Sequence, residues 1–333
     1  MSSGAVSERP SPSSRWWRLA QVGASLLVLV LLFRDMDGTA LASIGPRIEW
    51  GWLFVALATK LFTLALHEVR LWVSLNPPRP PLTRVVAIGF ASGVLNLVLP
   101  GRAGDLAAMG MLVRECRVRP GAAAAAVGVV AFLEAAMFGL TLVVVLALGA
   151  DRWRSVVGPD KWFQAMSGVS GLTLVGVLVA VTAVIITRRI RGGDEEGPRG
   201  PGPIEVIRDA ILQATDNLAA PATLAVNTGL ALLQVVGMIA AFAMIFPAVG
   251  VDVALPALAA SGVLAISSLA SVLLPPSYGA GPAAAAVFVL SAFGLGPEDA
   301  FAYSVGWWLV SQVPAVVVGV PAFYGRGERS GSS

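Results

Sequence analysis

The sequence predicts an all-α membrane protein: a polytopic helix bundle with about six full spans and two re-entrant hairpins of broken helix, which together form an inverted repeat. Three observations lead to this fold class. Hydrophobic residues make up 56% of the 333 residues and charged residues only 13%, about half the charged share of a soluble domain. Apolar stretches long enough to cross a bilayer recur along the whole chain. Two of these stretches are interrupted by proline and glycine, and the two interruptions resemble each other.

The first membrane half, residues 15–187, follows a tail at residues 1–14 that is rich in serine and proline and is expected to be disordered. Its first span is predicted at Trp16–Phe33. A cleaved signal peptide is the alternative, because residues 40–42 (Ala-Leu-Ala) resemble a cleavage site. The charged sequence RDMDG between them favours an uncleaved span instead. The second span is predicted at Trp50–Leu75.

The segment Val85–Val113 is apolar, but Pro100 and Gly101 divide it into two legs. Each leg is shorter than the roughly 20 residues that a full span requires. We therefore expect a re-entrant hairpin that returns to its own side of the membrane. Two further full spans complete this half of the protein, at Gly121–Gly149 and Trp162–Thr187.

A hydrophilic cytoplasmic linker is predicted at residues 188–203, and an amphipathic helix follows it at residues 204–219. Four apolar side chains share one face of that helix, a pattern that is typical of a helix lying on the membrane surface. An ordinary helical extension of the next span is the alternative, and the sequence leaves both open. The four side chains are Ile204, Ile207, Ile211 and Leu218.

The second membrane half, residues 220–325, contains full spans at Pro221–Phe246 and Ala300–Tyr324. Between them lie the apolar segments Leu255–Leu274 and Ala283–Phe293, separated by a stretch rich in proline and glycine. The shorter segment cannot cross a hydrocarbon core of about 30 Å at about 1.5 Å per residue. These two segments are therefore predicted to form the second hairpin.

Basic residues at the segment ends decide between two ways of threading the chain. With both hairpins re-entrant and the N-terminus inside, the inner segments hold 15 basic residues and the outer loops hold 5. A single crossing at the first broken segment would leave 8 inside and 12 outside. The positive-inside rule therefore predicts that the N-terminus and the C-terminal tail at residues 326–333 lie in the cytoplasm. The preference for arginine over lysine and the abundance of alanine, glycine and valine indicate a GC-rich bacterial genome, so we expect a multi-pass protein of the inner (plasma) membrane.

The two interruptions align with each other. Residues 99–104 read LPGRAG and residues 274–279 read LPPSYG, and each has a glycine four positions after its Leu-Pro proline. The threading brings the two hairpins in from opposite sides of the membrane. Inverted repeats whose broken helices meet near the midplane are a transporter architecture, and the paired breaks indicate the binding site.

The first hairpin carries an arginine and an aspartate at the start of its second leg. Non-helical backbone at membrane depth is tolerated only where it is buried in protein or lines a wet cavity. The free N–H groups of a helix start, together with a guanidinium, suit an anion such as the phosphate of a lipid headgroup. An ion pair between Arg102 and Asp105, or extension of Arg102 to the inner interface, is the alternative. The candidate residues are Pro100, Gly101, Arg102, Gly104 and Asp105.

Four polar side chains lie on one face of the second span, and ionisable groups within spans usually face the bundle interior or a water-filled cavity. Glu134, in the middle of a later span, is expected to lie close enough to Lys60 to interact with it. An interfacial anchor is the alternative for Arg70, and a hydrogen-bonded filler is the alternative for His67. The four side chains are Lys60, Thr63, His67 and Arg70.

The second hairpin contributes shape without charge, through Pro275, Tyr278, Gly279 and Gly281. A single cysteine and a single histidine in the sequence exclude a disulfide framework and a multi-histidine metal site. The sequence has no G-x-x-x-x-G-K-[ST] motif for binding ATP, and neither paired catalytic carboxylates nor a nucleophile–base pair can be identified. We therefore expect no enzymatic activity, no cofactor and no metal.

The two broken segments and the spans that follow them resemble the lysylphosphatidylglycerol synthase transmembrane-region family, a group of flippase-like membrane proteins. The resemblance covers about Trp16 to Tyr324 and is most specific in residues 99–105, which match Leu-Pro-Gly-Arg-x-Gly-(Asp/Glu). In bifunctional members this region moves aminoacylated phosphatidylglycerol between leaflets, and a soluble C-terminal domain makes that lipid. The resemblance implies the flippase-like part without the synthase. The chain departs from the family's polar pattern at Ala135, Phe138, Pro282-Ala283 and Trp307-Trp308.

Together these features predict a protein that binds an anionic phospholipid or lipid-linked intermediate and translocates it between leaflets. Arg102 would hold the phosphate, and Lys60, His67 and Arg70 would line the headgroup path. The alternative is a non-transporting scaffold that presents lipid to a separate lipid-modifying enzyme or glycosyltransferase. No nucleic-acid partner is expected, because the net charge is only +3 and the arginines lie at segment ends.

Overall fold

All the regular secondary structure that the structure describes is helical, which confirms the predicted all-α class. The N-terminal tail, the first predicted span, most of the predicted span Trp162–Thr187 and nearly all of the linker lie outside the described residues. The structure is a computed structural model. It describes residues 45–75, 77–98, 103–161, 164, 167–168, 170–171, 203–273 and 280–330.

Four helical segments of the described chain are long and apolar enough to cross a membrane, as a polytopic bundle requires. Three of them begin at a proline, whose fixed φ and missing N–H suit the first turn of a helix. The last helix continues to Ser330, beyond the predicted end of its span at Tyr324. The spans are α3 (Trp50–Ser74), α6 (Pro120–Leu148), α10 (Pro221–Ala243) continued by α11 (Ile245–Ala248), and α14 (Pro297–Ser330).

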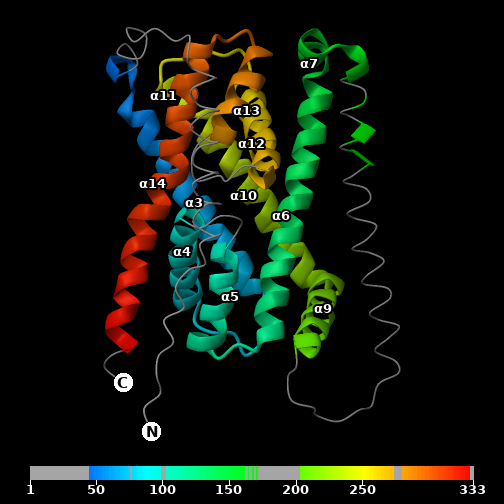
Figure 1. The fold of residues 1–333 in the computed structure, drawn as a ribbon, viewed down its shortest axis with the longest axis vertical. Coiled ribbons are helices and arrows are strands. Elements are labelled where there is room, and N and C mark those ends of the chain that lie inside the picture. Colours follow the sequence, from blue (N-terminus) through cyan, green and yellow to red (C-terminus); the bar gives the residue numbers. More distant parts are fainter. Residues whose placement is uncertain are drawn as a thin grey trace, which may run out of the picture.

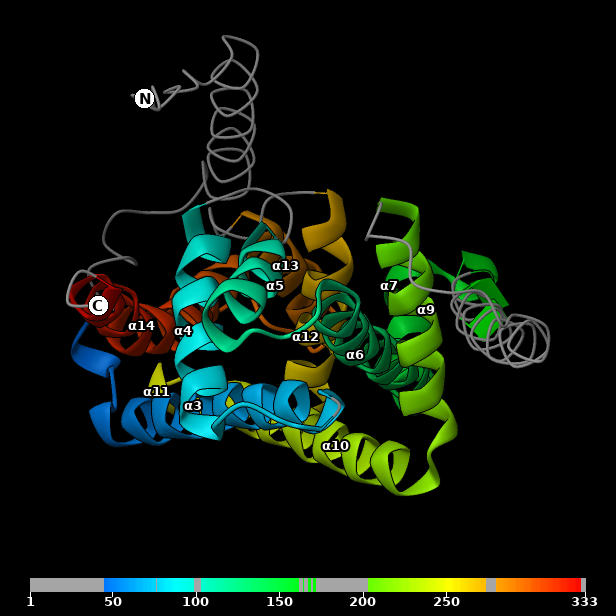
Figure 2. The ribbon, with the colours of Figure 1, turned by 90° about the horizontal axis from the view of Figure 1, so that it is seen from below.

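Helices α3 and α10 pack side by side and run in opposite directions, diagonal to the long axis of the bundle (Figures 1 and 2). A small residue permits this close approach. A side chain at Gly237 of α10 would place its Cβ only 2.7 Å from the Cγ2 of Thr63 on α3. The polar face of α3 therefore lies inside the bundle, where α6 and α14 also contact this helix.

Each predicted broken segment forms a pair of packed helices, α4 with α5 and α12 with α13. Figure 1 shows α4 and α5 in the lower half of the bundle and α12 and α13 in the upper half, so the two pairs enter from opposite ends. The turns at residues 99–102 and 274–279 lie outside the described residues. The helices are α4 (Leu82–Val98), α5 (Ala103–Cys116), α12 (Pro256–Leu273) and α13 (Ala280–Ser291).

The amphipathic helix α9 (Pro203–Ala219) is separate from α10 and lies across the lower end of the bundle, against α6 (Figure 2). Its apolar side chains Ile207 and Ile211 are 61% and 48% exposed. Its uncharged polar side chains Gln213, Thr215 and Asn217 are buried, and Asn217 Nδ2 donates a hydrogen bond to the backbone oxygen of Ser74 at 2.8 Å. This arrangement favours the membrane-surface helix over a simple extension of the next span.

The short helix α7 (Ala150–Val157) follows α6 at the upper end of the bundle (Figure 1). Its side chain Trp153 is buried and stacks on Phe288 of α13, with the ring centroids 5.9 Å apart. This contact ties the end of α6 to the upper helix pair.

Candidate functional site

A cavity of about 230 Å³ lies among α3, α4, α5, α6, α10 and α14. Its apolar walls come from two separate hydrophobic clusters. One cluster packs α3, α4, α5 and α6 together and contributes Leu71, Ala108 and Val130. The other, larger cluster packs α10, α12, α13 and α14 and contributes Met238. Eight polar or charged side chains also line this cavity, which we call the polar cavity. They are Lys60, His67, Glu68, Ser92, Asn96, Asp105, Glu134 and Gln234.

Helix α3 supplies three of the charged or titratable groups, because Lys60, His67 and Glu68 all line the polar cavity. Thr63 lies on the same stretch but is buried, and its Oγ1 donates to the backbone oxygen of Lys60 at 2.7 Å. The Nζ of Lys60 lies 5.7 Å from the ring centroid of Phe242 on α10, a cation–π distance. No ion pair of the described residues holds the Lys60 ammonium.

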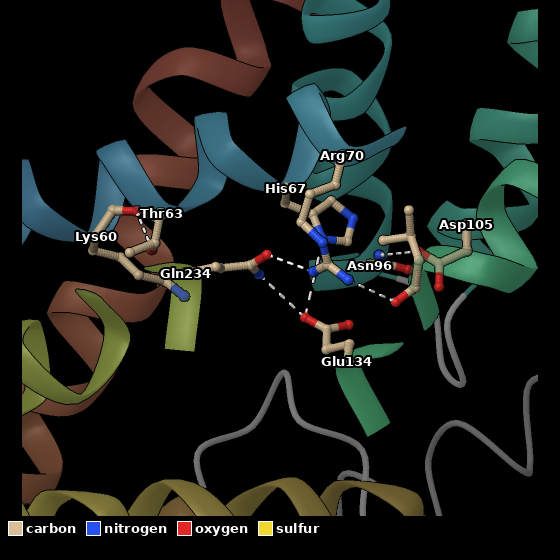
Figure 3. Close-up of polar contacts among 9 residues, drawn as sticks. Lys60, Thr63, His67, Arg70, Asn96, Asp105, Glu134 and Gln234 are labelled. Atoms are coloured by element: carbon tan, nitrogen blue, oxygen red, sulfur yellow. Dashed lines mark hydrogen bonds and ion pairs between the residues drawn. The ribbon is translucent and has the colours of Figure 1, made fainter. Parts of the chain in front are cut away.

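Arg70 does not line the polar cavity but lies buried beside it, 1% exposed. Its Nη1 donates to Gln234 Oε1 at 2.7 Å, and its Nη2 donates to the backbone oxygen of Val130 at 3.2 Å. Gln234 Nε2 in turn donates to Glu134 Oε1 at 3.3 Å. Figure 3 shows this chain of hydrogen bonds joining α3, α10 and α6. The burial of Arg70 rules out its alternative role as an anchor at the membrane interface.

Glu134 is the carboxylate that α6 contributes to the wall of the polar cavity. Its Oε1 lies 4.0 Å from His67 Nδ1, and the His67 and Glu134 side chains are 32% and 14% exposed. The expected neighbour, Lys60, lines the same cavity and interacts electrostatically with Glu134, although no direct ion pair joins the two among the contacts of the described residues. Gln234 and His67 occupy the contacting positions instead (Figure 3). Helical spacing predicts which face of α3 carries Lys60, but it does not predict which side chain contacts Glu134 directly.

Asn96 fixes the start of α5 against α4. Its Oδ1 accepts a hydrogen bond from the backbone N–H of Gly104 at 2.7 Å, and its Nδ2 donates to Asp105 Oδ1 at 3.2 Å. The side-chain oxygen thus satisfies one of the free N–H groups of the first helical turn. Gly104 is required at this position, because a Cβ there would overlap the backbone oxygen of Ser92. Asp105 consequently faces the polar cavity at the beginning of α5.

The structure thus brings Lys60, His67, Asp105 and Glu134 together around the polar cavity. Gly104 lies beside them, where α5 contacts α4 through the hydrogen bond to Asn96. Gly281 is buried on α13 and is not part of the cavity wall. Six candidate residues lie outside the described residues: Pro100, Gly101, Arg102, Pro275, Tyr278 and Gly279. Within the described chain, no group of three or more His, Cys, Asp or Glu side chains has an arrangement that could hold a metal ion.

Three residues of the site were missed as functional candidates: Glu68, Asn96 and Gln234. Asn96 and Gln234 carry a signal in the sequence, because each is a single polar side chain within an otherwise apolar helical run, whereas Glu68 lies between His67 and Arg70 in a polar stretch. Such residues are costly in a membrane unless they face the bundle interior and find a partner. A search for isolated amides in predicted spans would have found Asn96 and Gln234.

The profile of one protein family, described as "Lysylphosphatidylglycerol synthase TM region", matches residues 18–319. The match covers most of the chain. The protein belongs to the lysylphosphatidylglycerol synthase transmembrane-region family. This membership confirms the resemblance seen in the sequence and connects the protein with lipid handling in a membrane. No curated protein and no solved structure matches the chain.

Proposed function

We propose that this family member binds the headgroup of an anionic phospholipid, or of a lipid-linked intermediate, in the polar cavity and moves the lipid between leaflets. The polar cavity itself carries the proposal. A charged side chain that is buried without a partner in an apolar environment costs several kcal/mol. A bundle built only for packing would fill this space with apolar side chains, whereas here five titratable side chains surround an open volume.

Lys60 is the residue best suited to meet a phosphate among the described cavity walls. Its arm lies along Phe242, and no ion pair with a described carboxylate neutralises its ammonium. A phosphate oxygen would supply the missing charge-assisted hydrogen bonds. The acyl chains would remain in the lipid, outside the bundle. The predicted phosphate contact of Arg102 rests on the sequence alone.

The opposite placement of the α4–α5 and α12–α13 pairs supports an inverted repeat and, with it, transport by alternate opening of the two ends. The connections from α3 to α4 and from α5 to α6 lie at the lower end of the bundle (Figure 1). They and the adjoining helix ends carry Arg79, Arg84, Arg114 and Arg119, which favours that end as cytoplasmic. Helix α14 also ends at the lower end (Figure 1), so the C-terminus would be cytoplasmic as well.

We predict that single cysteines at Arg119 and Asp252 will be labelled from opposite sides of the membrane. Both positions are exposed. Position 119 lies in the connection between α5 and α6, at the lower end of the bundle, and position 252 lies in the connection between α11 and α12, at the upper end (Figure 1). The measurement uses a membrane-impermeant maleimide on intact cells, with Cys116 replaced by serine. Labelling of position 119 from the outer side would contradict the proposed topology.

A non-transporting lipid scaffold is the second candidate, and one observation favours it. The upper half of the bundle is closed by stacked aromatic rings, Phe246 on Tyr303 at 4.4 Å and Phe242 on Trp307 at 5.3 Å between centroids. A scaffold would keep this layer shut, whereas a transporter would have to open it. Lipid binding without lipid movement would distinguish the scaffold.

Translocation of fluorescent lipids in proteoliposomes, over a panel of headgroups, tests the proposal. We expect Lys60→Met to slow the movement of phosphatidylglycerol by about tenfold, because it removes a charge-assisted hydrogen bond worth about 1.5–3 kcal/mol. Lys161→Met is the matched control, since Lys161 is the other lysine of the chain and is exposed. Equal rates in the wild-type protein and in Lys60→Met would remove Lys60 from the site. If no protein moved lipid faster than protein-free liposomes do, the scaffold would be favoured.

A further inference from the structure

Glu68 is a buried carboxylate that the binding of an anionic headgroup does not explain. It lines the polar cavity and is only 7% exposed. Its Oε2 has no hydrogen-bond partner among the residues that the structure describes. In an apolar environment an ionised carboxylate is retained only when it is paired, hydrogen-bonded or bound to a cation, so this side chain requires a ligand of its own.

The position of the Glu68 carboxylate is fixed by a glycine on the facing helix. Both carboxylate oxygens lie where a Cβ of residue 89 would stand, so any side chain at Gly89 would displace them. The cavity wall that α4 contributes carries no charge, since it consists of Gly89, Phe90, Ser92, Gly93 and Asn96. The carboxylate therefore meets uncharged backbone and side chains on this side.

The other charged or titratable groups of the cavity do not balance Glu68. From its own helix come Lys60 and His67; α5 contributes Asp105 and α6 contributes Glu134, whereas α10 and α14 contribute only uncharged residues. Among the described residues of the cavity wall, three carboxylates thus share the space with one lysine and one histidine. With all three ionised, like charges would repel one another in a medium of low dielectric. Arg70, the buried guanidinium nearby, is already bound to Gln234 and Val130.

We propose that Glu68 binds an exchangeable proton and that lipid movement is coupled to its uptake and release, an inference that rests on the proposed function. An O–H bond forms when the carboxylate takes a proton from water on one side of the membrane, and it breaks when the proton passes to water on the other side. His67, which is one-third exposed, lines the same cavity and lies 4.0 Å from Glu134, would relay the proton.

Proton binding and phosphate binding reinforce each other in this cavity. Protonated Glu68 lowers the negative charge that an anionic headgroup meets, whereas ionised Glu68 repels it. Two ligands that favour each other's binding are thermodynamically coupled, and the coupling is reciprocal. One proton moving with one singly charged phosphodiester is an electroneutral step, so a pH gradient would drive the lipid and a membrane potential would not.

The test uses the full chain in vesicles of phosphatidylethanolamine and phosphatidylglycerol that contain a trace of fluorescent phosphatidylglycerol. At steady state the wild-type protein should shift the ratio of this lipid between the leaflets by about tenfold for each unit of pH gradient, since one coupled proton corresponds to about 1.4 kcal/mol per unit. The lipid should accumulate in the leaflet facing the more alkaline side. Glu68→Gln, which imitates the protonated state, should still move the lipid but leave it evenly distributed.

Two controls make the result specific. Asp252→Asn removes an exposed carboxylate that does not line the polar cavity and should keep the gradient-driven accumulation. Gly89→Ala keeps the Glu68 carboxylate but displaces it, and should weaken the accumulation. Even distribution of the lipid by the wild-type protein under a gradient would overturn the coupling and leave the proposed function intact, whereas no movement by the wild-type protein would overturn both.

Infrared spectroscopy supplies a readout that does not depend on transport. Near neutral pH the wild-type protein should show the carbonyl stretch of a protonated carboxylic acid, and that band should be lost in Glu68→Gln. The band should persist in Asp252→Asn. A wild-type spectrum without the band, or a band unchanged in folded Glu68→Gln, would overturn the assignment of the proton to Glu68.

Discussion

Replacing Arg70 with leucine is expected to destabilise the protein by about 3–5 kcal/mol, the loss seen when one partner of a buried charge pair is removed. The guanidinium is 1% exposed and donates hydrogen bonds to Gln234 and to the backbone of Val130. Without it, Gln234 Oε1 loses its donor, and the negative charge of Glu134 loses the positive charge on the other side of Gln234. The measurement is thermal unfolding of the purified protein in detergent.

Arg84→Leu is the matched control for Arg70→Leu. Arg84 is exposed and donates one hydrogen bond of 3.3 Å to the backbone oxygen of Glu115, so its loss should change stability by no more than about 0.5 kcal/mol. A double replacement, Arg70→Leu with Glu134→Gln, should lose less stability than the sum of the two single replacements. Equal melting temperatures for Arg70→Leu and Arg84→Leu would contradict the role of Arg70 in the hydrogen-bond chain.

Replacing Gly104 with alanine is expected to destabilise the protein by about 2 kcal/mol, because a side chain there overpacks the contact between α4 and α5. Its Cβ would overlap the backbone oxygen of Ser92, which cannot move aside as a flexible side chain could. The displacement would also lengthen the hydrogen bond from Gly104 N–H to Asn96 Oδ1, which is 2.7 Å. Thermal unfolding of the purified protein measures the loss.

Gly110 offers a control on the same helix. Nothing lies within 4 Å of a Cβ built at Gly110, so Gly110→Ala should stabilise α5 by about 0.5–1 kcal/mol through helix propensity and the entropy of the unfolded chain. The two substitutions add the same methyl group to one helix, and only the neighbours differ. If Gly104→Ala were as stable as Gly110→Ala, the close approach of α5 to α4 would be wrong.

The membrane fold could be predicted because its signals are local. The lengths of apolar runs give the spans, and the prolines and glycines near Pro100 and Pro275 give the breaks. The two helix pairs at opposite ends of the bundle correspond to these breaks (Figure 1). The position of α9 could not be decided, because the same amphipathic pattern suits a surface helix and a helical extension. The exposure of Ile207 and Ile211, together with the burial of Gln213, Thr215 and Asn217, favours the surface helix.

The site was predicted in part, because helical spacing gives a direction for each side chain but not the partner it meets. Lys60 and His67 do line the polar cavity, whereas Arg70, on the same predicted face, is held beside the cavity by Gln234. Gln234 lies on a helix that is distant in the sequence, so nothing local relates it to Arg70. The missing partner of Glu68 likewise appears only when the facing wall of α4 is known.

Site-specific photo-crosslinking tests most directly whether the polar cavity holds a lipid headgroup. A photoreactive amino acid is placed at Leu64, which lines the cavity, or at Leu140, which is 51% exposed on α6, and the adducts formed in membranes of known composition are identified by mass. We expect adducts at Leu64 that are enriched in anionic phospholipid, whereas those at Leu140 should reflect the bulk composition. No lipid adduct at Leu64, or the same composition at both positions, would contradict a headgroup site in the cavity.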